Sequence, residues 1–378
     1  MNPYCFDNIA PDRRCTAYIN LEAIKHNFDV IAQLVAPSKV IAVVKANAYG
    51  HGAVEVARAL SGRASLFAVA TCGEAIQLRQ ANICDLILIL GHVEPSLASH
   101  IALHNIEITV HTLEHAYLLS SQLNQGQRLN VHIKLDTGMS RLGFAVSDTA
   151  SILKLWDITG INPVGLFTHF AAADSIQAED KLFTAKQYER FVQVKEYLHA
   201  CGKDLLCHVS NSAASMHYPE FRENAVRTGI LLYGLSPSPM DKQLLSKLKP
   251  AMVLKAQISE IKKLRAGSCI SYGRTYRANK DITVATISAG YADGYPRALS
   301  SQGSVSIKEC PATILGRICM DQLMVDVSAI KDIHVGDEVT LFGGNSCADS
   351  IDDIAAKCNT ISYEIVTGIS SRVSRCYL

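Results

Sequence analysis

Residues 40–50 read VIAVVKANAYG, in which a lysine directly follows a run of five apolar residues. A β-branched run of this length predicts a buried strand. A lysine at the carboxyl end of such a strand is expensive to bury unless it has a partner or a chemical task. In an α/β barrel this end of the strand faces the active site, where a desolvated amine has a lowered pKa and can attack a carbonyl group. The alternative is that Lys45 extends along the surface until its charge reaches water.

The composition indicates a globular protein of two domains, since 378 residues are too many for one ordinary core. Only 19% of the residues are charged and the net charge is +1, which gives no electrostatic reason to expect nucleic acid or a membrane surface as a partner. The longest apolar runs, such as residues 86–90, are too short to span a bilayer. The first residues lack the basic and apolar regions of a signal peptide, so we expect a cytoplasmic protein.

Twelve cysteines are scattered along the chain without a C-x-x-C pair or a Cys/His cluster at zinc spacing. Several, such as Cys84 and Cys319, stand in apolar contexts. We therefore expect buried, reduced thiols in a cytosolic protein and no metal site, and the alternative is a secreted protein with disulfides.

Strand-like and helix-like segments alternate through the first two-thirds of the chain. Strands are expected at 40–44, 66–70, 86–90, 106–110, 131–135, 163–168, 206–209 and 227–233. Helices are expected at 21–34, 52–60, 73–81, 112–121, 149–156 and 180–200. Eight βα units at this spacing indicate a (β/α)8 barrel. A doubly wound open sheet is the competing fold, but no G-x-G-x-x-G follows the first strand.

The pattern changes after residue 235, where SPSP at 236–239 reads as a linker. Helical segments then become rare, which predicts a second, mostly β domain. Its strands are expected at 251–261, 282–289, 312–318, 324–327 and 338–342. We therefore expect a barrel domain over 12–245 and a β-rich domain over 246–378, against which residues 1–11 pack.

A family resemblance covers the chain from about residue 16 to residue 377. Residues 43–52, VVKANAYGHG, resemble the pyridoxal phosphate (PLP) lysine motif of bacterial alanine racemases. Further motifs follow in the order and spacing of that family: KLDTGMSRLG at 134–143, THFA at 168–171, NSAA at 211–214, RTGILLYG at 227–234, SYG at 271–273, GYADGYPR at 290–297, CMDQ at 319–322 and ISYE at 361–364. The resemblance implies a PLP-dependent isomerase that interconverts L- and D-alanine and supplies D-alanine for peptidoglycan.

The resemblance implies two catalytic residues, Lys45 and Tyr272. Lys45 forms the internal aldimine with PLP, as a neutral lysine does with an aldehyde. Racemisation needs a base on each face of a planar intermediate, and Lys45, once displaced by substrate, is one of them. Tyr272 is the other, and in this family it comes from the partner subunit, which implies a homodimer with shared active sites. The alternative for Tyr272 is an aromatic strand residue that packs on the barrel.

The cofactor phosphate is expected at the last two βα loops of the barrel, where such folds often bind phosphate. The resemblance assigns it to Tyr49, Ser212, Gly229, Ile230 and Tyr363. Glycine lets backbone N–H groups approach an anion closely. Asn211 belongs to the same set of cofactor-binding residues, with a helix cap at 211–212 as the alternative.

Arg227 is placed by the resemblance against the pyridine nitrogen of PLP. A permanently cationic arginine disfavours a second positive charge beside it, so the ring nitrogen stays neutral. A weaker electron sink suits an enzyme that must return a proton and avoid decarboxylation or transamination. His169 is expected to bond Arg227, and the alternative is a satisfied core histidine.

The substrate carboxylate is assigned to Arg141 and to the backbone N–H of Met320 from the partner subunit, with the cofactor's phenolic oxygen as a second possible ligand of the arginine. Lys134 supports Arg141; in several family members this lysine is carbamylated, and an ordinary lysine is the alternative. Asp321 resembles a residue at the active-site entrance. Tyr363 leaves room for only a methyl side chain, which favours alanine over serine, though such pockets discriminate weakly.

Three rival functions share parts of this pattern. A PLP-dependent decarboxylase of basic amino acids has the same two domains, but that family places a carboxylate where Arg227 stands and a cysteine where Tyr272 stands. A PLP-binding barrel protein without turnover would lack the β domain. A periplasmic racemase of broad specificity would need a signal sequence.

Overall fold

The computed structural model describes residues 14–237, 245–344 and 346–378. Contacts divide them into two compact units: a barrel unit, residues 22–249, and a β unit made by residues 250–378 together with the described part of residues 1–21. The expected domain boundary placed residues 12–21 with the barrel. Strand β1 (Cys15–Ile19) instead pairs with strands of the β unit. The segment 1–11 and the end of the expected linker lie outside the described residues.

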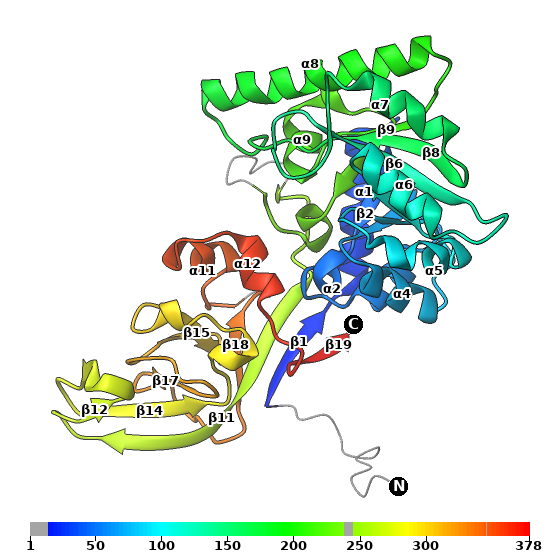
Figure 1. Cartoon of the computed structure of the whole chain (residues 1–378). Coiled ribbons are helices and arrows are strands. Elements are labelled where there is room, and N and C mark those ends of the chain that lie inside the picture. Colours follow the sequence, from blue (N-terminus) through cyan, green and yellow to red (C-terminus); the bar gives the residue numbers. More distant parts are fainter. Residues whose placement is uncertain (1–13, 238–244, 345) are drawn as a thin grey trace, which may run out of the picture. The chain divides into compact units, whose positions relative to one another are not determined.

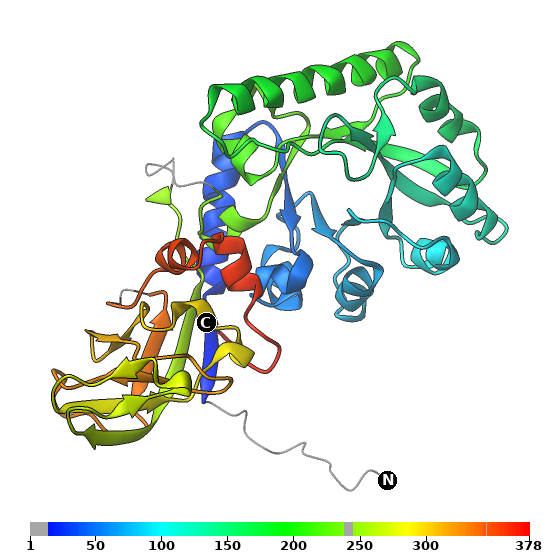
Figure 2. The same cartoon turned by 60° about the vertical axis from the view of Figure 1, so that its left-hand side comes forward.

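The barrel unit is built on eight parallel strands, as the alternation predicted (Figure 1 and Figure 2). The first and last strands in this order, β10 and β9, are neighbours. On one side β10 pairs with β2, and on the other the backbone N–H of Arg227 in β10 donates to the carbonyl oxygen of Ser210, just after β9, at 2.8 Å. The strands, in the order of the ring from β10, are β10 (Ala225–Thr228), β2 (Lys39–Val43), β3 (Leu66–Val69), β4 (Ile87–Ile89), β5 (Glu107–Val110), β6 (Leu129–Asp136), β8 (Ile161–Phe167) and β9 (Leu206–His208). A short strand, β7 (Phe144–Ala145), pairs with β6.

Helices alternate with these strands, and several begin at a side-chain cap. Thr71 and Glu74 form a capping box at the start of α4, and Thr112 and Asp148 cap α6 and α7. The helices are α1 (Leu21–Val35), α3 (Ala53–Leu60), α4 (Cys72–Gln80), α5 (Ala98–Leu103), α6 (Leu113–Ser121), α7 (Thr149–Leu153), α8 (Ala178–Ala200) and α9 (Ser212–His217). The six expected helices are all present, and 149–156 divides into α7 and a 3-10 turn.

The last expected strand, 227–233, is wrong over its second half. Strand β10 ends at Thr228, and the apolar residues that follow form a 3-10 turn, Ile230–Tyr233, that closes at Gly234 with φ of 74°. All four residues of the turn are fully buried. A short apolar run reads the same whether it is a buried strand or a buried helical turn, so periodicity could not separate the two.

The β unit contains one larger sheet and a small two-stranded one. Strand β11 (Met252–Leu264) pairs along one half with β1 and β18 and along the other half with β14, with a register irregularity between Ile258 and Glu260. The remaining elements are β12 (Cys269–Ile270), β13 (Tyr276–Arg277), β14 (Ile282–Ile287), β15 (Ser304–Ile307), β16 (Cys310–Thr313), β17 (Leu323–Asp326), β18 (Glu338–Phe342), β19 (Ser374–Tyr377), α11 (Ile351–Lys357) and α12 (Ser362–Thr367). Each of the five strands expected in this domain overlaps an observed one.

The cysteines of the described residues form no disulfide, as expected. Their burial was predicted less well. Cys84 is exposed, because it lies in the turn before β4 rather than in the strand, and Cys319 is half-buried.

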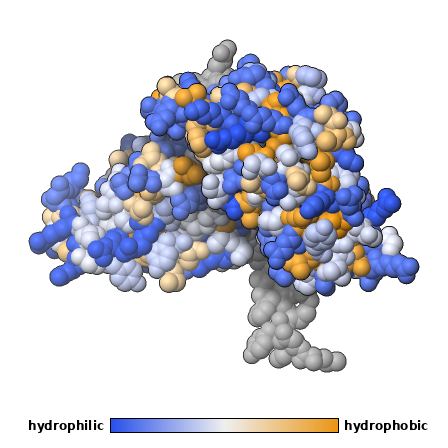
Figure 3. All heavy atoms as spheres, turned by 45° about the horizontal axis from the view of Figure 1, so that its top comes forward, coloured by the Kyte–Doolittle hydropathy of each residue, from blue (hydrophilic) through white to orange (hydrophobic). Residues whose placement is uncertain are grey.

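The surface is mixed in character. Figure 3 shows hydrophobic residues in separate patches among hydrophilic ones on the face it presents. Within the described residues, the helices are either too short or too polar to cross a membrane.

A buried carboxylate connects three segments of the β unit. Asp293, in the GYADGYPR motif, is fully buried and accepts from the backbone N–H of Gly290 at 2.9 Å. Arg14 contacts it at 2.5 Å and the Nε of Arg372 at 3.0 Å. Because a buried charge needs such partners, Asp293 ties the residue before β1 and the segment before β19 to its own turn.

Asp293→Ala should lower the free energy of unfolding by about 3–5 kcal/mol, because it leaves arginine partners without their buried acceptor. The matched control is Asp321→Ala. Asp321 contacts the same Arg372 at 2.6 Å but is itself 55% exposed, so its loss should change stability little. Urea denaturation of both variants measures the difference, and equal effects would show that burial of the pair is not what matters.

Candidate active site

Lys45 directly follows strand β2 and opens a turn of unusual handedness. The four residues after it, residues 46–49, all have positive φ between 51° and 53°, so α2 (Lys45–Tyr49) is in large part a left-handed turn. Each non-glycine residue in this conformation costs about 1–2 kcal/mol. Such strain is kept only where the surroundings impose it, and it is concentrated at functional sites.

The surroundings of this turn supply several hydrogen bonds. The backbone N–H of Ala46 donates to Glu74 Oε1 at 2.7 Å, and the other oxygen of Glu74 accepts from Ala70 at 2.7 Å. The ring of His51 is fully buried, and its Nδ1 bonds the carbonyl of Tyr49 at 2.9 Å. The left-handed turn thereby holds Lys45 and Tyr49 at a fixed spacing.

Tyr49 meets two other predicted residues at the same end of the barrel. Ser212, the first residue of α9, accepts the backbone N–H of Gly229 at 3.0 Å. A Cβ atom at Gly229 would lie 2.4 Å from the hydroxyl of Tyr49. Three loops therefore converge at a point where only glycine fits, with Ile230 next in the chain. Asn211 caps α9 by accepting from Ala214 at 2.9 Å, which was the alternative role for this residue.

Arg227 lies in β10 and is only 4% exposed. Its guanidinium donates to the carbonyl oxygens of Thr168 at 2.7 Å, of Val209 at 3.0 Å, and of His208. Burial lowers the pKa of Arg227 to about 9, so the group remains charged at neutral pH. His169 is a further partner, with its Nδ1 3.3 Å from the guanidinium.

Three buried residues that the sequence analysis did not predict form a hydrogen-bonded chain that starts at Arg227: His208, His132 and Glu107. Arg227 lies 3.0 Å from Nδ1 of His208, whose Nε2 lies 2.8 Å from Nδ1 of His132, whose Nε2 lies 2.8 Å from Oε2 of Glu107. An arginine can only donate and a carboxylate accepts, so each histidine donates toward Glu107. The sequence does contain a sign of this chain, because Glu107 and His132 are polar residues inside otherwise apolar strands.

Two lysines of the site have lowered pKa values. Burial lowers the pKa of Lys45, and the charges of Arg141 and Arg227 lower it further, against an opposing effect of Glu74. Lys134, in β6, is 8% exposed, and its amine has no hydrogen-bond partner. Burial, with Arg227 and Arg141, lowers its pKa well below the usual value.

His169 is subject to the same effects. Burial and the charge of Arg227 lower the pKa of His169 well below its usual value, so the ring is neutral at pH 7. Arg141 itself is exposed, in the segment after β6. The barrel unit thus brings together the buried cation Arg227 and amines and imidazoles whose pKa values are lowered.

The β unit gathers a second group of predicted residues. Tyr272 begins a 3-10 turn, Tyr272–Arg274, and is 68% exposed; Met320 is 52% exposed. Both line a hollow of about 360 Å³, together with Asp321. Tyr363 lies on α12 of the same unit. Exposed aromatic and apolar side chains of this kind commonly mark a surface that another molecule covers.

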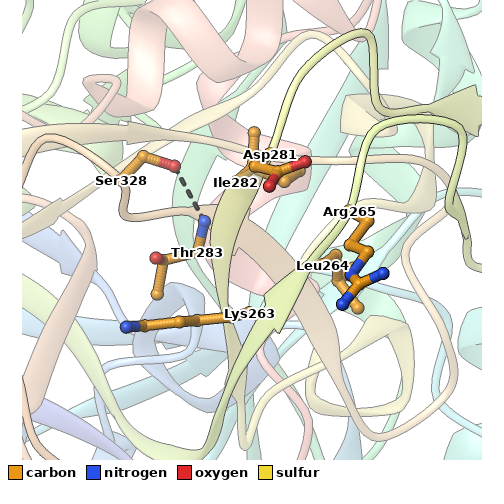
Figure 4. Close-up of a pocket in the computed structure, with 7 residues that line it drawn as sticks. All are labelled: Lys263, Leu264, Arg265, Asp281, Ile282, Thr283 and Ser328. Carbon is orange, nitrogen blue, oxygen red and sulfur yellow. Dashed lines mark hydrogen bonds between the residues drawn. The ribbon is translucent and has the colours of Figure 1, made fainter.

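A different hollow of the β unit, of about 420 Å³, contains none of the predicted residues (Figure 4). Lys263 and Arg265 extend in different directions in this view, and the bond drawn joins the backbone of Thr283 to Ser328 at 2.9 Å. A binding site needs polar groups that converge on a ligand. This hollow is therefore not a candidate.

Comparison with known families adds a decisive finding. The model of the alanine racemase N-terminal domain matches residues 19–237, and that of the alanine racemase C-terminal domain matches residues 251–377. The chain belongs to the alanine racemase family. Family membership confirms the resemblance read from the motifs.

Curated and solved relatives agree over nearly the whole chain. The alanine racemase of Desulforamulus reducens is 44% identical over 96% of this chain and 98% of its own length, and that of Clostridium perfringens is 42% identical over 96% and 94%. The solved structure of alanine racemase from Clostridium difficile 630 has a TM-score of 0.91 at 39% identity and covers 97% of this chain and 96% of its own. The alanine racemase of Bacillus anthracis, with bound L-Ala-P, has a TM-score of 0.91 at 34% identity, over 98% and 96%.

Lys134→Met should make the protein more stable at pH 7, by about 1 kcal/mol or more, because it removes a buried amine that has no partner. The native pKa of Lys134 is lowered, so between that pKa and the unfolded value of about 10.4 the unfolded chain binds more protons. Stability of the unsubstituted protein therefore rises with pH in this window, and the variant should lose that slope. Urea denaturation at several pH values in carbon dioxide-free buffer measures both effects.

The control for this prediction is Lys186→Met on α8, where the lysine is exposed. It should change neither the stability nor its pH dependence. A Lys134→Met protein less stable at pH 7 would mean that the amine is satisfied in the native state.

Proposed function

We propose that this protein is a PLP-dependent alanine racemase that interconverts L- and D-alanine. The observation that carries the proposal is a lysine with a lowered pKa, Lys45, held by a strained turn at the same end of the barrel as the Tyr49–Ser212–Gly229 contact. Among the structural relatives, one alanine racemase contains bound L-Ala-P and another is a complex with cycloserine. Both ligands are small and amino-acid-like, in agreement with the proposed substrate class.

The barrel residues fit PLP. Gly229 leaves the space that a Cβ would fill, where the hydroxyl of Tyr49 lies, and the hydroxyl of Ser212 accepts the backbone N–H of Gly229. We assign the cofactor phosphate to these residues with Ile230, and Asn211 supports their loop as the cap of α9. PLP, when bound, supplies an aldehyde for Lys45 and a conjugated ring that withdraws electrons from the substrate's Cα.

Arg227 is proposed to face the cofactor's pyridine nitrogen. A fixed cation there disfavours protonation of that nitrogen, which limits how far electrons are withdrawn. His169 and the chain through His208 to Glu107 hold the guanidinium in orientation and balance its charge. This arrangement favours return of a proton to Cα over loss of the carboxylate, and it counts against a decarboxylase.

Lys45 and Tyr272 are proposed to hold and deliver protons on opposite faces of Cα. The neutral amine of Lys45 accepts a proton from one enantiomer, and the phenol of Tyr272 from a second copy of the chain donates to the other face. The exposure of Tyr272 and Met320 supports a homodimer in which each site takes them from the neighbouring copy.

Substrate binding is assigned to Arg141, which would hold the carboxylate with the backbone N–H of Met320 from the other copy. Lys134 would hold Arg141 in place, either as an amine or, after carbamylation, as a carboxylate. A neutral buried amine is the form that reacts with carbon dioxide, so the lowered pKa favours the modification. Asp321 is proposed to lie at the site entrance, and Tyr363 to contact the phosphate and limit the side chain to a methyl group.

The proposed setting is the cytoplasm, where D-alanine is needed as a precursor of peptidoglycan. No nucleic acid or membrane partner is proposed. The alternatives are distinguished by one incubation with L-alanine in deuterated water. Deuterium at Cα with loss of optical rotation indicates a racemase, release of carbon dioxide indicates a decarboxylase, and neither indicates a binding protein.

Lys45→Ala and Tyr272→Phe should each lower the racemisation rate by at least about 100-fold, since each removes a proton-transfer group. Coexpression of the two variants tests the shared site. Half of the dimers are then mixed and each holds one complete site of two, so about a quarter of the unsubstituted activity should return. Deuterium exchange at Cα and loss of optical rotation are the measurements.

The control is Tyr276→Phe, a partly buried tyrosine in β13 that packs against apolar residues of the β unit. Its activity should equal that of the unsubstituted enzyme. Activity that fails to return on coexpression would contradict a site shared between two copies.

Gly229→Ala should weaken PLP binding by about tenfold or more, because overpacking of about 1–3 kcal/mol must push the Tyr49 hydroxyl aside. Gly73→Ala, where an added Cβ meets nothing within 4 Å, is the control and should leave the affinity unchanged. Titration of the apoenzyme with PLP, followed by absorbance, measures both. Equal affinities of the two variants would contradict the assignment of the cofactor phosphate to the position beside Tyr49 and Gly229.

A further inference from the structure

Three histidines gather where strands β4 and β5 end, apart from the residues assigned above. His92 follows β4, His111 directly follows β5, and His115 lies in the first turn of α6. One potential ligand atom from each lies within 4.8 Å of the other two. Within the described ranges, no other group of histidine, cysteine or acidic residues is arranged in this way.

The spacing of two of these nitrogens is already close to that of a metal site. Nδ1 of His92 lies 3.0 Å from Nε2 of His111. Two imidazole nitrogens bound tetrahedrally to zinc, each at about 2.0–2.1 Å, are about 3.3–3.4 Å apart. The third ring is close to both, since the centroid of His115 lies 4.6 Å from that of His92 and 4.5 Å from that of His111.

His115 carries the observation that points to a ligand. The residue is 3% exposed, and its Nε2 bonds the carbonyl oxygen of Val93 at 2.8 Å, so Nε2 bears the proton. Its Nδ1 then has a lone pair, and this buried atom has no hydrogen-bond partner. A buried acceptor without a partner is costly. Metal-binding histidines characteristically bond a backbone carbonyl through their other nitrogen, as His115 does.

The backbone around the cluster is held independently of any ligand. Thr112 caps α6 by accepting the backbone N–H of His115 at 3.1 Å. The exposure of the three rings increases from buried His115 through His111 to exposed His92. The cluster therefore has one buried ligand whose backbone is held in place, His115, and one exposed ligand, His92, on the side from which an ion can enter.

We propose that His92, His111 and His115 form a binding site for a divalent transition-metal ion of the zinc class. Imidazole nitrogens suit zinc, nickel, copper and cobalt, and three of them leave a fourth position for water. Each neutral imidazole offers one lone pair in the plane of its ring. Binding requires that the proton between His92 and His111 moves to the other nitrogen of its own ring, and that the stacked rings of His111 and His115 turn so that their lone pairs converge. The ion would join the loop after β4 to the start of α6, and the proposal is independent of racemase activity.

The test uses the full-length, PLP-loaded protein without an affinity tag, freed of metal by a chelator. Equilibrium dialysis against Co²⁺ and against Zn²⁺ should find one ion per chain at this site. His111→Gln and His115→Gln should each lower the affinity at least about tenfold, since loss of even an outer partner of a ligand costs about 10–100-fold. His92→Gln, at the exposed position, gives the same test if a buried variant fails to fold.

The matched control is His104→Gln. His100 and His104 form the other close pair in this part of the chain, with ring centroids 4.3 Å apart, and they are a rival site for the ion. This variant should bind as tightly as the unsubstituted protein. Loss of binding in His104→Gln, or unchanged binding in the variants of the cluster, would overturn the proposal.

The exposed cysteines are a second rival, and the cobalt spectrum separates them from the histidines. Thiolate ligands give strong charge-transfer bands in the near ultraviolet, whereas three imidazoles give only ligand-field bands in the visible region. We expect visible bands alone, together with a rise in melting temperature on adding zinc that the cluster variants lose. Thiolate bands from the first bound ion would also overturn the proposal.

Discussion

The centre of the barrel unit depends on one buried cation. Arg227 is surrounded by backbone carbonyl oxygens from the ends of β8 and β9, and a charge at this depth is tolerated only with such partners. Satisfying its donors fixes how the ends of these strands approach β10. The loops that carry Ser212 and Gly229 start from those ends, so the geometry of the proposed phosphate site follows from the solvation of a single guanidinium.

The same cation disfavours the protonated forms of its neighbours. Its charge lowers the pKa values of Lys45, Lys134 and His169, in addition to the effect of burial. Arg227 therefore stays charged beside three groups whose protonated forms are disfavoured. At the far end of this hydrogen-bonded chain, the carboxylate of Glu107 accepts from His132, which itself accepts from His208.

Much of the fold could be predicted because it rests on local patterns. Alternating apolar runs located the barrel strands, and the motif around Lys45 indicated the position of the proposed site. The prediction of a strand at 230–233 was wrong because a buried turn and a buried strand have the same apolar composition. Glu107, His132 and His208 were missed because their contact is between strands distant in sequence. The histidine cluster was missed for the same reason, because His92 follows a different strand from His111 and His115.

The left-handed turn after β2 has a consequence for how this segment can vary. A turn of that hand advances and rotates the chain differently from an ordinary helical turn, so residues 46–48 act as a spacer of fixed length between Lys45 and Tyr49. Insertion or deletion of one residue would rotate the phenol away from Gly229 even if every side chain were kept. Changes of identity toward glycine or asparagine, which accept this backbone, are compatible with the spacer. The segment is thus constrained in length and, in composition, to residues that accept a left-handed backbone.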